Sequence, residues 1–363
     1  MSSSLSVCCV MSLAINTARF LRSGDLEYND GHHDPDVPMS DQTDPSIPPN
    51  LRPQPADVAY DLDRALDAVV SLRTRIPEDA FTASILGTER AGHGVLIGER
   101  GLVLTIGYLV TEANDVWLVG NNGRAVRGDV VGYDYESGLG LVQALGSLDL
   151  PALSLGSVKD LRLQQEVVLA GCGGRAHALK ARVAAKREFA GYWEYVLDEA
   201  VYTAPPHPNW GGAALLGADG RLCAIGSLYI DQVMPQMPGQ DGNMSVPVDL
   251  LEPIMTDLMS YGRTLKPARP WLGMFVSEVD AQLLVAGVYD DAPAAQTALR
   301  TGDVITEVGG LPVNGLATLF RTVWAQGSAG CEVPLTVHRE GHSFEVRVPS
   351  VDRREFWRAP DLH

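Results

Sequence analysis

Short runs of apolar residues, separated by glycine-rich turns, recur about every ten residues between residues 81 and 262. Strands of an all-β domain show this spacing, because each short strand is buried on at least one face before a turn reverses the chain. Within this region "GADGRL" (217–222) suits a hairpin turn in which Asp219 and Gly220 supply positive φ. The pattern predicts an all-β sandwich or barrel, with runs such as "HGVLIG", "GLVLTIG", "EVVLAG" and "AALLGADGRLCAIGSLY" as its strands.

Two flanking segments have helical spacing instead. Residues 58–77 place apolar side chains at Val58, Leu62 and Leu66 and continue with further valines and leucines, which suits an amphipathic helix. Residues 246–263 predict a second helix that ends at Gly262.

The last third of the chain has a mixed pattern. After a proline-containing linker (264–270), short strands alternate with two helical patterns, "PAAQTALR" and "LATLFRTVWAQ". A segment of about 80 residues with this alternation predicts a small α+β domain.

The N-terminal segment lacks periodic apolar positions. Residues 23–46 contain seven Asp or Glu and no Lys or Arg, and prolines are frequent up to residue 57, so we expect disorder over 23–57. The stretch "GHHDPD" (31–36) has metal-ligand residue types, but a solvated polar tail is the favoured interpretation, and no metal site is predicted. Residues 5–15 have the length of a signal-peptide core without preceding basic residues, so a weak signal segment and a true start at Met11 remain alternatives.

Composition narrows the class of partner. The 363 residues are enough for two domains and tails, and the net charge of −17 argues against nucleic acid and anionic membranes as partners. Five scattered cysteines without a CxxC spacing predict neither a disulfide framework nor a zinc site, and no cofactor is expected.

Four motifs in order resemble the HtrA (Deg-type) serine proteases. These are "HGVLIGERGLVLTIGYLV", "VVGYDYESGLGLVQA", "PNWGGAALLGADGRLCAIGS" and "SVPVDLLEPIMTDLMSYGR", and "RTGDVI" (301–306) is typical of the PDZ domain that follows in that family. The resemblance implies a mainly β fold, a trypsin-like double β-barrel followed by a small α+β PDZ-like domain. The predicted division is a tail (1–57), a helix or linker (58–80), a protease-fold domain (81–263), a PDZ domain (264–353) and a tail (354–363).

The resemblance also places the catalytic positions, and none carries the expected residue. Trp210 stands at the serine, Tyr108 at the histidine and Gly138 at the aspartate, while Pro208 stands where a backbone N–H of the oxyanion hole is needed. An indole has no nucleophilic atom, a phenol with a pKa of about 10 is a poor base at neutral pH, glycine has no side chain and proline has no N–H.

Nearby residues do not rebuild the missing set. Ser137 is next to the aspartate position, but adjacent strand residues face opposite ways, and neither His207 nor His93 completes a Ser–His–Asp set that respects the motifs. A catalytically inactive homologue is therefore predicted, with an active endopeptidase using non-standard residues as the alternative. Trp210 either fills or reshapes the cleft, anchors a peptide, or is simply tolerated.

The PDZ resemblance implies peptide binding. The candidate peptide-binding residues belong to the carboxylate-binding loop and to the wall of the groove, and they are Trp271, Leu272, Gly273, Met274, Leu319 and Phe320. Arg269 is a possible added charge. A purely structural module is the alternative. Expected partners are C-terminal or unfolded peptides and an active HtrA relative. A homo- or hetero-oligomer is expected, and the family resemblance implies a trimer. The resemblance implies the periplasm or cell envelope, and the cytoplasm is expected if the N-terminus is no signal peptide.

Overall fold

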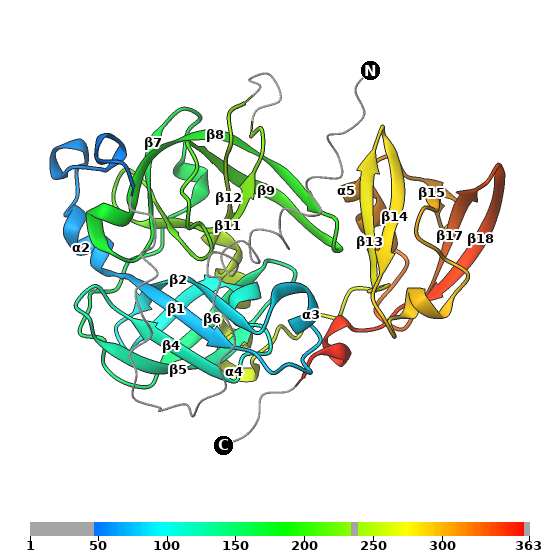
Figure 1. Cartoon of the computed structure of the whole chain (residues 1–363), viewed down its shortest axis with the longest axis horizontal. Helices are drawn as coiled ribbons and strands as arrows, with labels where there is room; N and C mark the ends of the chain where they lie inside the picture. Colours follow the sequence, from blue (N-terminus) through cyan, green and yellow to red (C-terminus); the bar gives the residue numbers. More distant parts are fainter. Residues whose placement is uncertain (1–46, 234–238, 359–363) are drawn as a thin grey trace, which may run out of the picture.

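The chain forms two closed six-stranded barrels followed by a smaller sheet domain (Figure 1). The computed structural model describes residues 47–233 and 239–358. The predicted mainly β fold, with a double barrel and a small α+β domain, is confirmed.

The first barrel has the strand order β1-β2-β3-β6-β5-β4 and closes because β1 pairs with both β2 and β4. Its strands are β1 (Val69–Arg75), β2 (Glu89–Gly98), β3 (Leu102–Ile106), β4 (Asp115–Val119), β5 (Ala125–Tyr133) and β6 (Leu139–Ala144). Two short helical elements accompany it, α3 (Ala83–Leu86) and η3 (Gly107–Leu109).

The predicted helix over 58–77 is wrong beyond its first half. Helix α2 spans only Leu62–Asp67, and β1 follows after one residue. The apolar spacing is compatible with both structures, but β-branched residues such as Val69 and Val70 favour a strand. They are fully buried in the barrel, whose closure provides strand partners on both sides.

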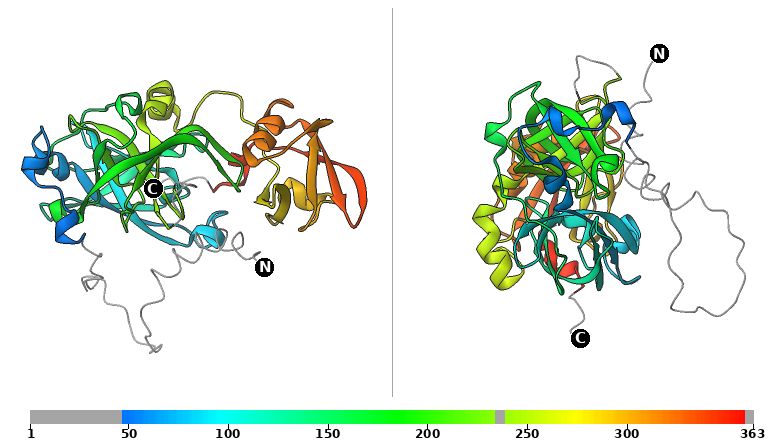
Figure 2. Two further views of the ribbon diagram at one scale, coloured as in Figure 1. Left: turned by 90° about the horizontal axis from the view of Figure 1, so that it is seen from above. Right: turned by 90° about the vertical axis from the view of Figure 1, so that its left-hand side faces the viewer.

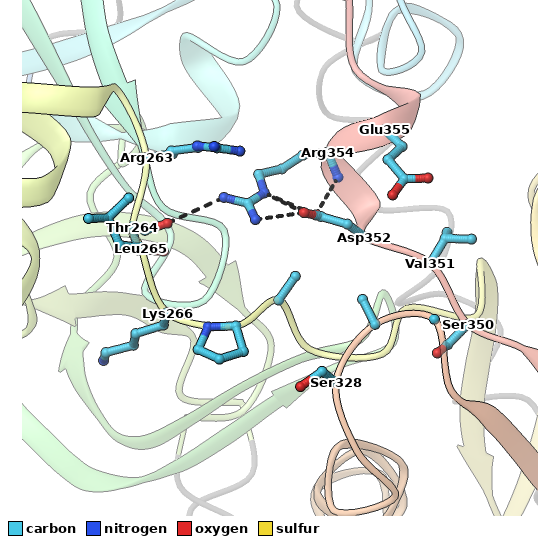
Figure 3. A pocket seen from close by; sticks show the side chains of 14 residues that line it. Arg263, Thr264, Leu265, Lys266, Ser328, Ser350, Val351, Asp352, Arg354 and Glu355 are labelled. Atoms are coloured by element: carbon cyan, nitrogen blue, oxygen red, sulfur yellow. Dashed lines mark hydrogen bonds and ion pairs between the residues drawn. The ribbon is translucent and has the colours of Figure 1, made fainter.

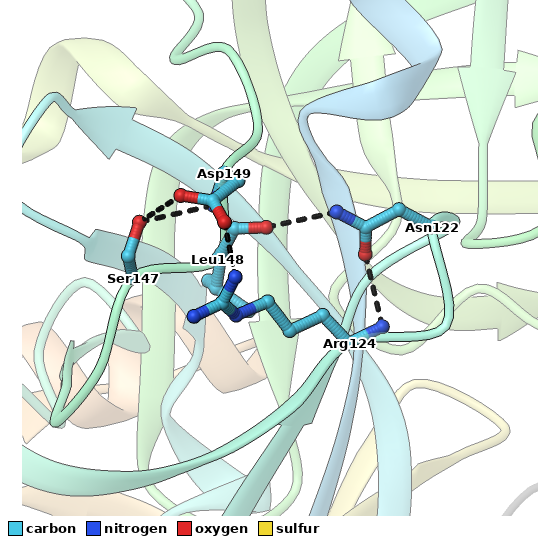
Figure 4. A network of polar contacts seen from close by, with 5 residues as sticks. All are labelled: Asn122, Arg124, Ser147, Leu148 and Asp149. Atoms are coloured by element: carbon cyan, nitrogen blue, oxygen red, sulfur yellow. Dashed lines mark hydrogen bonds and ion pairs between the residues drawn. The ribbon is translucent and has the colours of Figure 1, made fainter.

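A polar network fixes the turn between β4 and β5 (Figure 4). The side-chain amide of Asn122 donates to the carbonyl oxygen of Leu148 at 2.9 Å, and its Oδ1 accepts from the backbone N–H of Arg124 at 3.0 Å. The Arg124 guanidinium forms an ion pair with Asp149. Because this ion pair is exposed, it contributes little to stability.

The second barrel has the order β10-β11-β12-β9-β8-β7. Its strands are β7 (Glu166–Ala170), β8 (Ala178–Gly191), β9 (Tyr195–Ala204), β10 (Ala214–Leu216), β11 (Leu222–Ile230) and β12 (Gly242–Pro247), with η4 (Val158–Asp160) and η5 (Gly174–His177) on its loops. The β8–β9 hairpin is long and extends from the barrel toward the C-terminal domain (Figures 1 and 2).

Part of the predicted disordered tail is ordered. Ile47 is 1% exposed in the core of the second barrel, and its N–H donates to the Ala176 carbonyl oxygen at 2.8 Å. Two short 3-10 turns follow, η1 (Pro49–Leu51) and η2 (Pro55–Asp57). The expectation of disorder is therefore wrong for residues 47–57, while 5–15 and 31–36 lie outside the described residues.

The helix predicted over 246–263 begins later than expected. Residues up to Pro247 belong to β12, then η6 (Val248–Leu250) leads into α4 (Glu252–Tyr261). The predicted end at Gly262 is confirmed, because this residue has a φ of +69° and donates its N–H to the Leu258 carbonyl oxygen. In residues 47–233 and 239–358, no helix combines the length and apolar character needed to cross a membrane.

The C-terminal domain contains one sheet and two helical elements. Its strands are β13 (Met274–Val279), β14 (Gln282–Val288), β15 (Val304–Val308), β16 (Leu311–Pro312), β17 (Glu332–Arg339) and β18 (His342–Pro349), with η7 (Pro293–Gln296) and α5 (Leu316–Trp324).

A cavity of about 520 Å³ lies between the linker and residues 350–355 (Figure 3). Arg354 lies there, paired with Asp352 at 2.6 Å.

The segment predicted as a C-terminal tail packs back onto the first barrel. It forms η8 (Arg353–Phe356), and the Trp357 ring lies 4.7 Å from the Tyr133 ring. The backbone N–H of Arg358 donates to the Glu112 carboxylate at 2.8 Å. The expected tail is therefore wrong as far as residue 358, and 359–363 lie outside the described residues.

Candidate functional site

The turn that precedes β10 is held by both barrels. From the second barrel, the Gly212 N–H donates to the Gly226 carbonyl oxygen at 2.8 Å. From the first barrel, the His93 N–H donates to the Gly211 carbonyl oxygen at 2.8 Å. This cross-barrel position is where the sequence resemblance puts the nucleophile.

Trp210 occupies the presented position of this turn. Its indole is half-buried, and its ring centroid lies 5.6 Å from that of Tyr229 on β11, at an interplanar angle of 47°. The Tyr229 hydroxyl in turn donates to Asp241 at 2.7 Å. The indole thus packs along a strand of the second barrel and offers no nucleophilic atom.

Tyr108, at the histidine position, acts as a link between the barrels. Element η3 presents it, and its hydroxyl donates to the Ser227 carbonyl oxygen on β11 at 2.9 Å. Burial raises the pKa of this phenol well above its usual value of 10. A hydroxyl that already donates its proton to a carbonyl and resists ionisation has no capacity as a general base.

Gly138, at the aspartate position, has no room for a side chain. Its φ is +80°, and a Cβ there would lie 2.8 Å from the Tyr195 hydroxyl. That hydroxyl donates to the Ser137 carbonyl oxygen at 2.7 Å. The Gly138 carbonyl oxygen accepts from the Gly107 N–H, next to Tyr108, so these two candidate positions are close in space.

Pro208 removes one donor from the region where an oxyanion would bind, and its neighbour is already engaged. The N–H of Asn209 donates to Nδ1 of His207 at 3.0 Å. The backbone before Trp210 therefore provides neither of these two groups for anion stabilisation.

Two histidines considered separately in the sequence come together in the structure. A Cβ at Gly171 would lie 2.8 Å from His93 Nε2 and 3.4 Å from His207 Cε1. His93 Nδ1 accepts from the Cys172 N–H, and His207 Nε2 donates to the His177 carbonyl oxygen at 3.0 Å. Burial, reinforced by the neighbouring histidines, lowers the pKa of His93 to about 3, so both rings fit neutral structural roles.

Replacing His93 by Asn should reduce the loss of stability on mild acidification. In the unfolded chain His93 takes up a proton near pH 6.5, whereas in the folded chain it stays neutral. The contribution of His93 to the free energy of unfolding therefore falls as the pH decreases below 6.5. Between pH 7 and 5 we expect the free energy of unfolding of wild type to fall by about 2 kcal/mol more than that of His93→Asn. Urea unfolding at both pH values measures this difference. His338→Asn, at an exposed histidine, is the control, and equal pH dependence in wild type and His93→Asn would contradict the assignment.

The predicted carboxylate-binding loop of the C-terminal domain is occupied. The Glu194 carboxylate, from the turn between β8 and β9, accepts from the backbone N–H groups of Leu272 at 3.3 Å, Gly273 at 2.9 Å and Met274 at 3.3 Å. Glu194 is 6% exposed. Its burial raises the pKa of the carboxyl to about 7, against the lowering effect of these three donors and of Arg353.

The groove beside this loop is also covered by the hairpin. The Val276 N–H on β13 donates to the Tyr192 carbonyl oxygen at 3.1 Å. Val196, on β9, belongs to the same buried apolar cluster as Leu319 and Phe320 on α5. The predicted groove residues Leu319 and Phe320 are therefore buried in one cluster with a residue of the hairpin.

Two other predicted PDZ residues have different partners. Trp271 is buried among aromatic rings, including Phe81 of the first barrel and Phe356 of η8. The Arg269 guanidinium pairs with Glu136 at 3.0 Å and lies 4.1 Å from the Trp324 ring centroid. The expectation that Arg269 adds charge to the carboxylate loop is therefore not met by this geometry. Among the described residues, no group of three His, Cys, Asp or Glu is placed to hold a metal ion.

Comparison with known proteins defines the class. The family "Trypsin-like peptidase domain" matches residues 92–225, and the family "PDZ domain" matches residues 270–349. The two matches together describe a trypsin-like peptidase domain followed by a PDZ domain.

Curated relatives make this more specific. A "Probable periplasmic serine endoprotease DegP-like" of Halomonas elongata is 27% identical and covers 71% of this chain, and one of Pseudomonas fluorescens is 28% identical over the same share. This chain spans 55% of each relative, about half their length. The chain is therefore similar to DegP-like endoproteases over its trypsin-like and PDZ segments.

Two solved structures are similar to this chain at low sequence identity. The structure "HtrA-type protease AlgWS227A with tripeptide" is 23% identical, with a TM-score of 0.49, and covers 83% of this chain and 97% of that chain. A serine endoprotease of Yersinia pestis is 21% identical with a TM-score of 0.48, and covers 81% of this chain and 99% of that chain.

Glu194 is the residue at the PDZ loop that sequence reasoning missed. It lies in "GYWEYV" (191–196), where three aromatic residues surround one acid at a hairpin tip. That composition suggests a buried contact, but no local pattern identifies the loop that binds the carboxylate, which is 78 residues away in sequence.

Proposed function

We propose that this chain is a catalytically inactive HtrA-type protease homologue that acts by binding peptides or protein partners. The observation that carries the proposal is the pairing of Trp210 at the nucleophile position with a Tyr108 hydroxyl that donates to the Ser227 carbonyl oxygen. Acyl transfer by this mechanism needs a nucleophile and a base, and this pair supplies neither.

The two remaining positions support the same conclusion. Gly138 is closed to a side chain by Tyr195, and Pro208 lacks a donor whose loss alone typically costs about two to three orders of magnitude in rate. The turn itself is present, with Gly211 accepting from His93 of the first barrel and Gly212 donating to Gly226 of the second. Retention of the frame without its reactive groups favours a binding role over hydrolysis.

The binding role is assigned to the PDZ domain. Its loop directs the N–H groups of Leu272, Gly273 and Met274 at one carboxylate, which is the recognition chemistry for a peptide C-terminus. Partners of this chemistry include unfolded chains and the C-terminus of an active relative, so the chain would serve as a chaperone, an adaptor or a regulatory subunit. Assembly with itself or that relative, as a trimer by family resemblance, belongs to the proposal.

A fluorophosphonate probe tests the inactive state, because it labels any activated serine. We expect the purified full chain to remain unlabelled under conditions in which trypsin is labelled stoichiometrically. Mass spectrometry of the intact protein measures the labelled fraction.

Stoichiometric labelling of the chain would overturn the proposal and favour an endopeptidase with non-standard residues. Ser137→Ala and Ser227→Ala would then locate the reactive group, because both serines are next to the candidate positions. Labelling that persists in both variants would still contradict inactivity and would place the nucleophile elsewhere in the chain.

A further inference from the structure

Glu194 presents its side chain to the PDZ loop as a peptide C-terminus would present its carboxylate. It lies at the tip of the β8–β9 turn with a φ of +62°, a left-handed conformation that is uncommon for glutamate. One oxygen, Oε1, lies within 3.3 Å of all three successive N–H groups of the loop. Three donors converging on one acceptor are the feature by which such loops capture a terminal carboxylate.

The backbone of the same turn adds to the sheet beside this loop. Two residues before Glu194, the Tyr192 carbonyl oxygen accepts from the Val276 N–H, and Val276 comes two residues after Met274. Tyr192 and Glu194 are two residues apart in the turn, and Met274 and Val276 are two residues apart in β13. This spacing matches that of a strand added to the edge of a sheet, in which alternate residues point the same way. The turn therefore meets β13 by a main-chain contact as well as by its carboxylate.

Apolar and charged contacts extend the match to helix α5. Val196 is 7% exposed within the apolar cluster that includes Leu319 and Phe320, where a C-terminal aliphatic side chain would bind. From α5, Arg321 forms ion pairs with Glu188 on β8 and Asp198 on β9. The hairpin thus uses the loop, the strand and the helix that together make the groove.

We infer that the β8–β9 turn is an internal ligand of the PDZ groove, with the Glu194 carboxylate in the place of a peptide C-terminus. The inference rests on the proposed peptide-binding function and adds its regulation. A free peptide binds only when the turn leaves, so its apparent affinity is reduced by the fraction of molecules in which the groove is open. Tethering makes the turn a strong competitor, because effective concentrations of tethered ligands reach the millimolar range.

The remaining open part of the groove indicates which peptides would compete. A cavity of about 310 Å³ lies between β8, β13 and the start of α5, lined by residues that include Glu188 and Glu278. A peptide with an aliphatic C-terminal residue and a basic residue upstream suits this chemistry. A suitable probe is the fluorescein-labelled peptide Lys-Gly-Tyr-Trp-Val with a free carboxylate, and its C-terminal amide is the matched negative.

Glu194→Ala in the full chain tests the internal ligand by two measurements. Hydrogen exchange of the Leu272, Gly273 and Met274 amides should accelerate at least tenfold, because their acceptor is removed. Fluorescence anisotropy should show at least tenfold tighter binding of the free-carboxylate peptide, with no gain for the amide. Glu194→Gln, which keeps the size and one acceptor oxygen, should fall between wild type and Glu194→Ala and provides a second variant if the first is poorly folded.

Glu199→Ala is the matched control, since Glu199 lies on the same hairpin and pairs with Lys186 rather than the PDZ loop. Unchanged exchange at 272–274 in Glu194→Ala would overturn the inference. Equal peptide affinity in wild type and Glu194→Ala would overturn it too, while leaving the peptide-binding function intact. Accelerated exchange without binding of the peptide would support the internal ligand and count against the proposed function.

Discussion

Gly212→Ala is expected to abolish the folded state of the double barrel. A Cβ at this position would lie 1.8 Å from the His93 carbonyl oxygen and 3.0 Å from Thr105 Oγ1, and the φ of +79° is already unfavourable for alanine. The His93 carbonyl oxygen, on β2, cannot move aside easily, because it accepts from the hydroxyl of Thr105 on β3 at 2.7 Å. Together these effects should cost more than about 4 kcal/mol.

Gly123→Ala is the control that separates strain from collision. Gly123 also has a φ of +79°, in the β4–β5 turn, but a Cβ there would have no neighbour within 4 Å. Its substitution should cost only the strain of about 1–2 kcal/mol. Far-UV circular dichroism and thermal unfolding compare the two variants. A Gly212→Ala protein as stable as Gly123→Ala would show that the turn and β2 are not in this close contact.

The expected loss in Gly212→Ala gives the retained turn a structural reason. Gly211 accepts from His93 and Gly212 donates to Gly226, so the turn joins the two barrels whether or not it presents a nucleophile. Tyr108 adds a further link through Ser227. Residues of such a turn are needed by the fold itself, which is why motif retention alone does not establish activity.

The sequence predicted most strands of the two barrels, but it predicted the segments that flank them less well. Alternating apolar runs and Gly262 identified strands and a helix end because these depend on local burial and backbone conformation. Strand β1 was missed because its apolar positions also fit a helix, and only pairing with β2 and β4 decides between the two. Ile47 and Trp357 were assigned to tails because each packs against residues distant in sequence.

The candidate sites divide in the same way. Trp210 and Pro208 follow from motif spacing, and the roles assigned to them remain predictions. The contact of the Glu194 carboxylate with the PDZ loop could not be predicted from the sequence, because Glu194 and Gly273 are distant in sequence and meet only in the packed domains. The space beside Gly138 is filled in a comparable way by Tyr195, from the other barrel. In both places a residue of the β8–β9 hairpin region makes the contact, and it comes from a distant part of the chain.

Restoring the aspartate position is therefore expected to destabilise the protein rather than to restore a triad. In Gly138→Asp the new Cβ would lie 2.8 Å from the Tyr195 hydroxyl at a φ of +80°. It would also disturb the hydrogen bond from that hydroxyl to the Ser137 carbonyl oxygen. We expect a loss of about 3 kcal/mol, and no proteolysis when Tyr108→His, Pro208→Gly and Trp210→Ser are added.

A double-mutant cycle attributes this loss to Tyr195. Without the hydroxyl, the nearest ring atom would be 3.4 Å from the new Cβ, which is close to an ordinary contact. Gly138→Ala should therefore cost about 1 kcal/mol less in a Tyr195→Phe background than in wild type, as measured by urea unfolding of the four proteins. Additive effects would mean that Tyr195 does not close the position, and casein hydrolysis by the fourfold variant would show that the cleft still accepts a working triad.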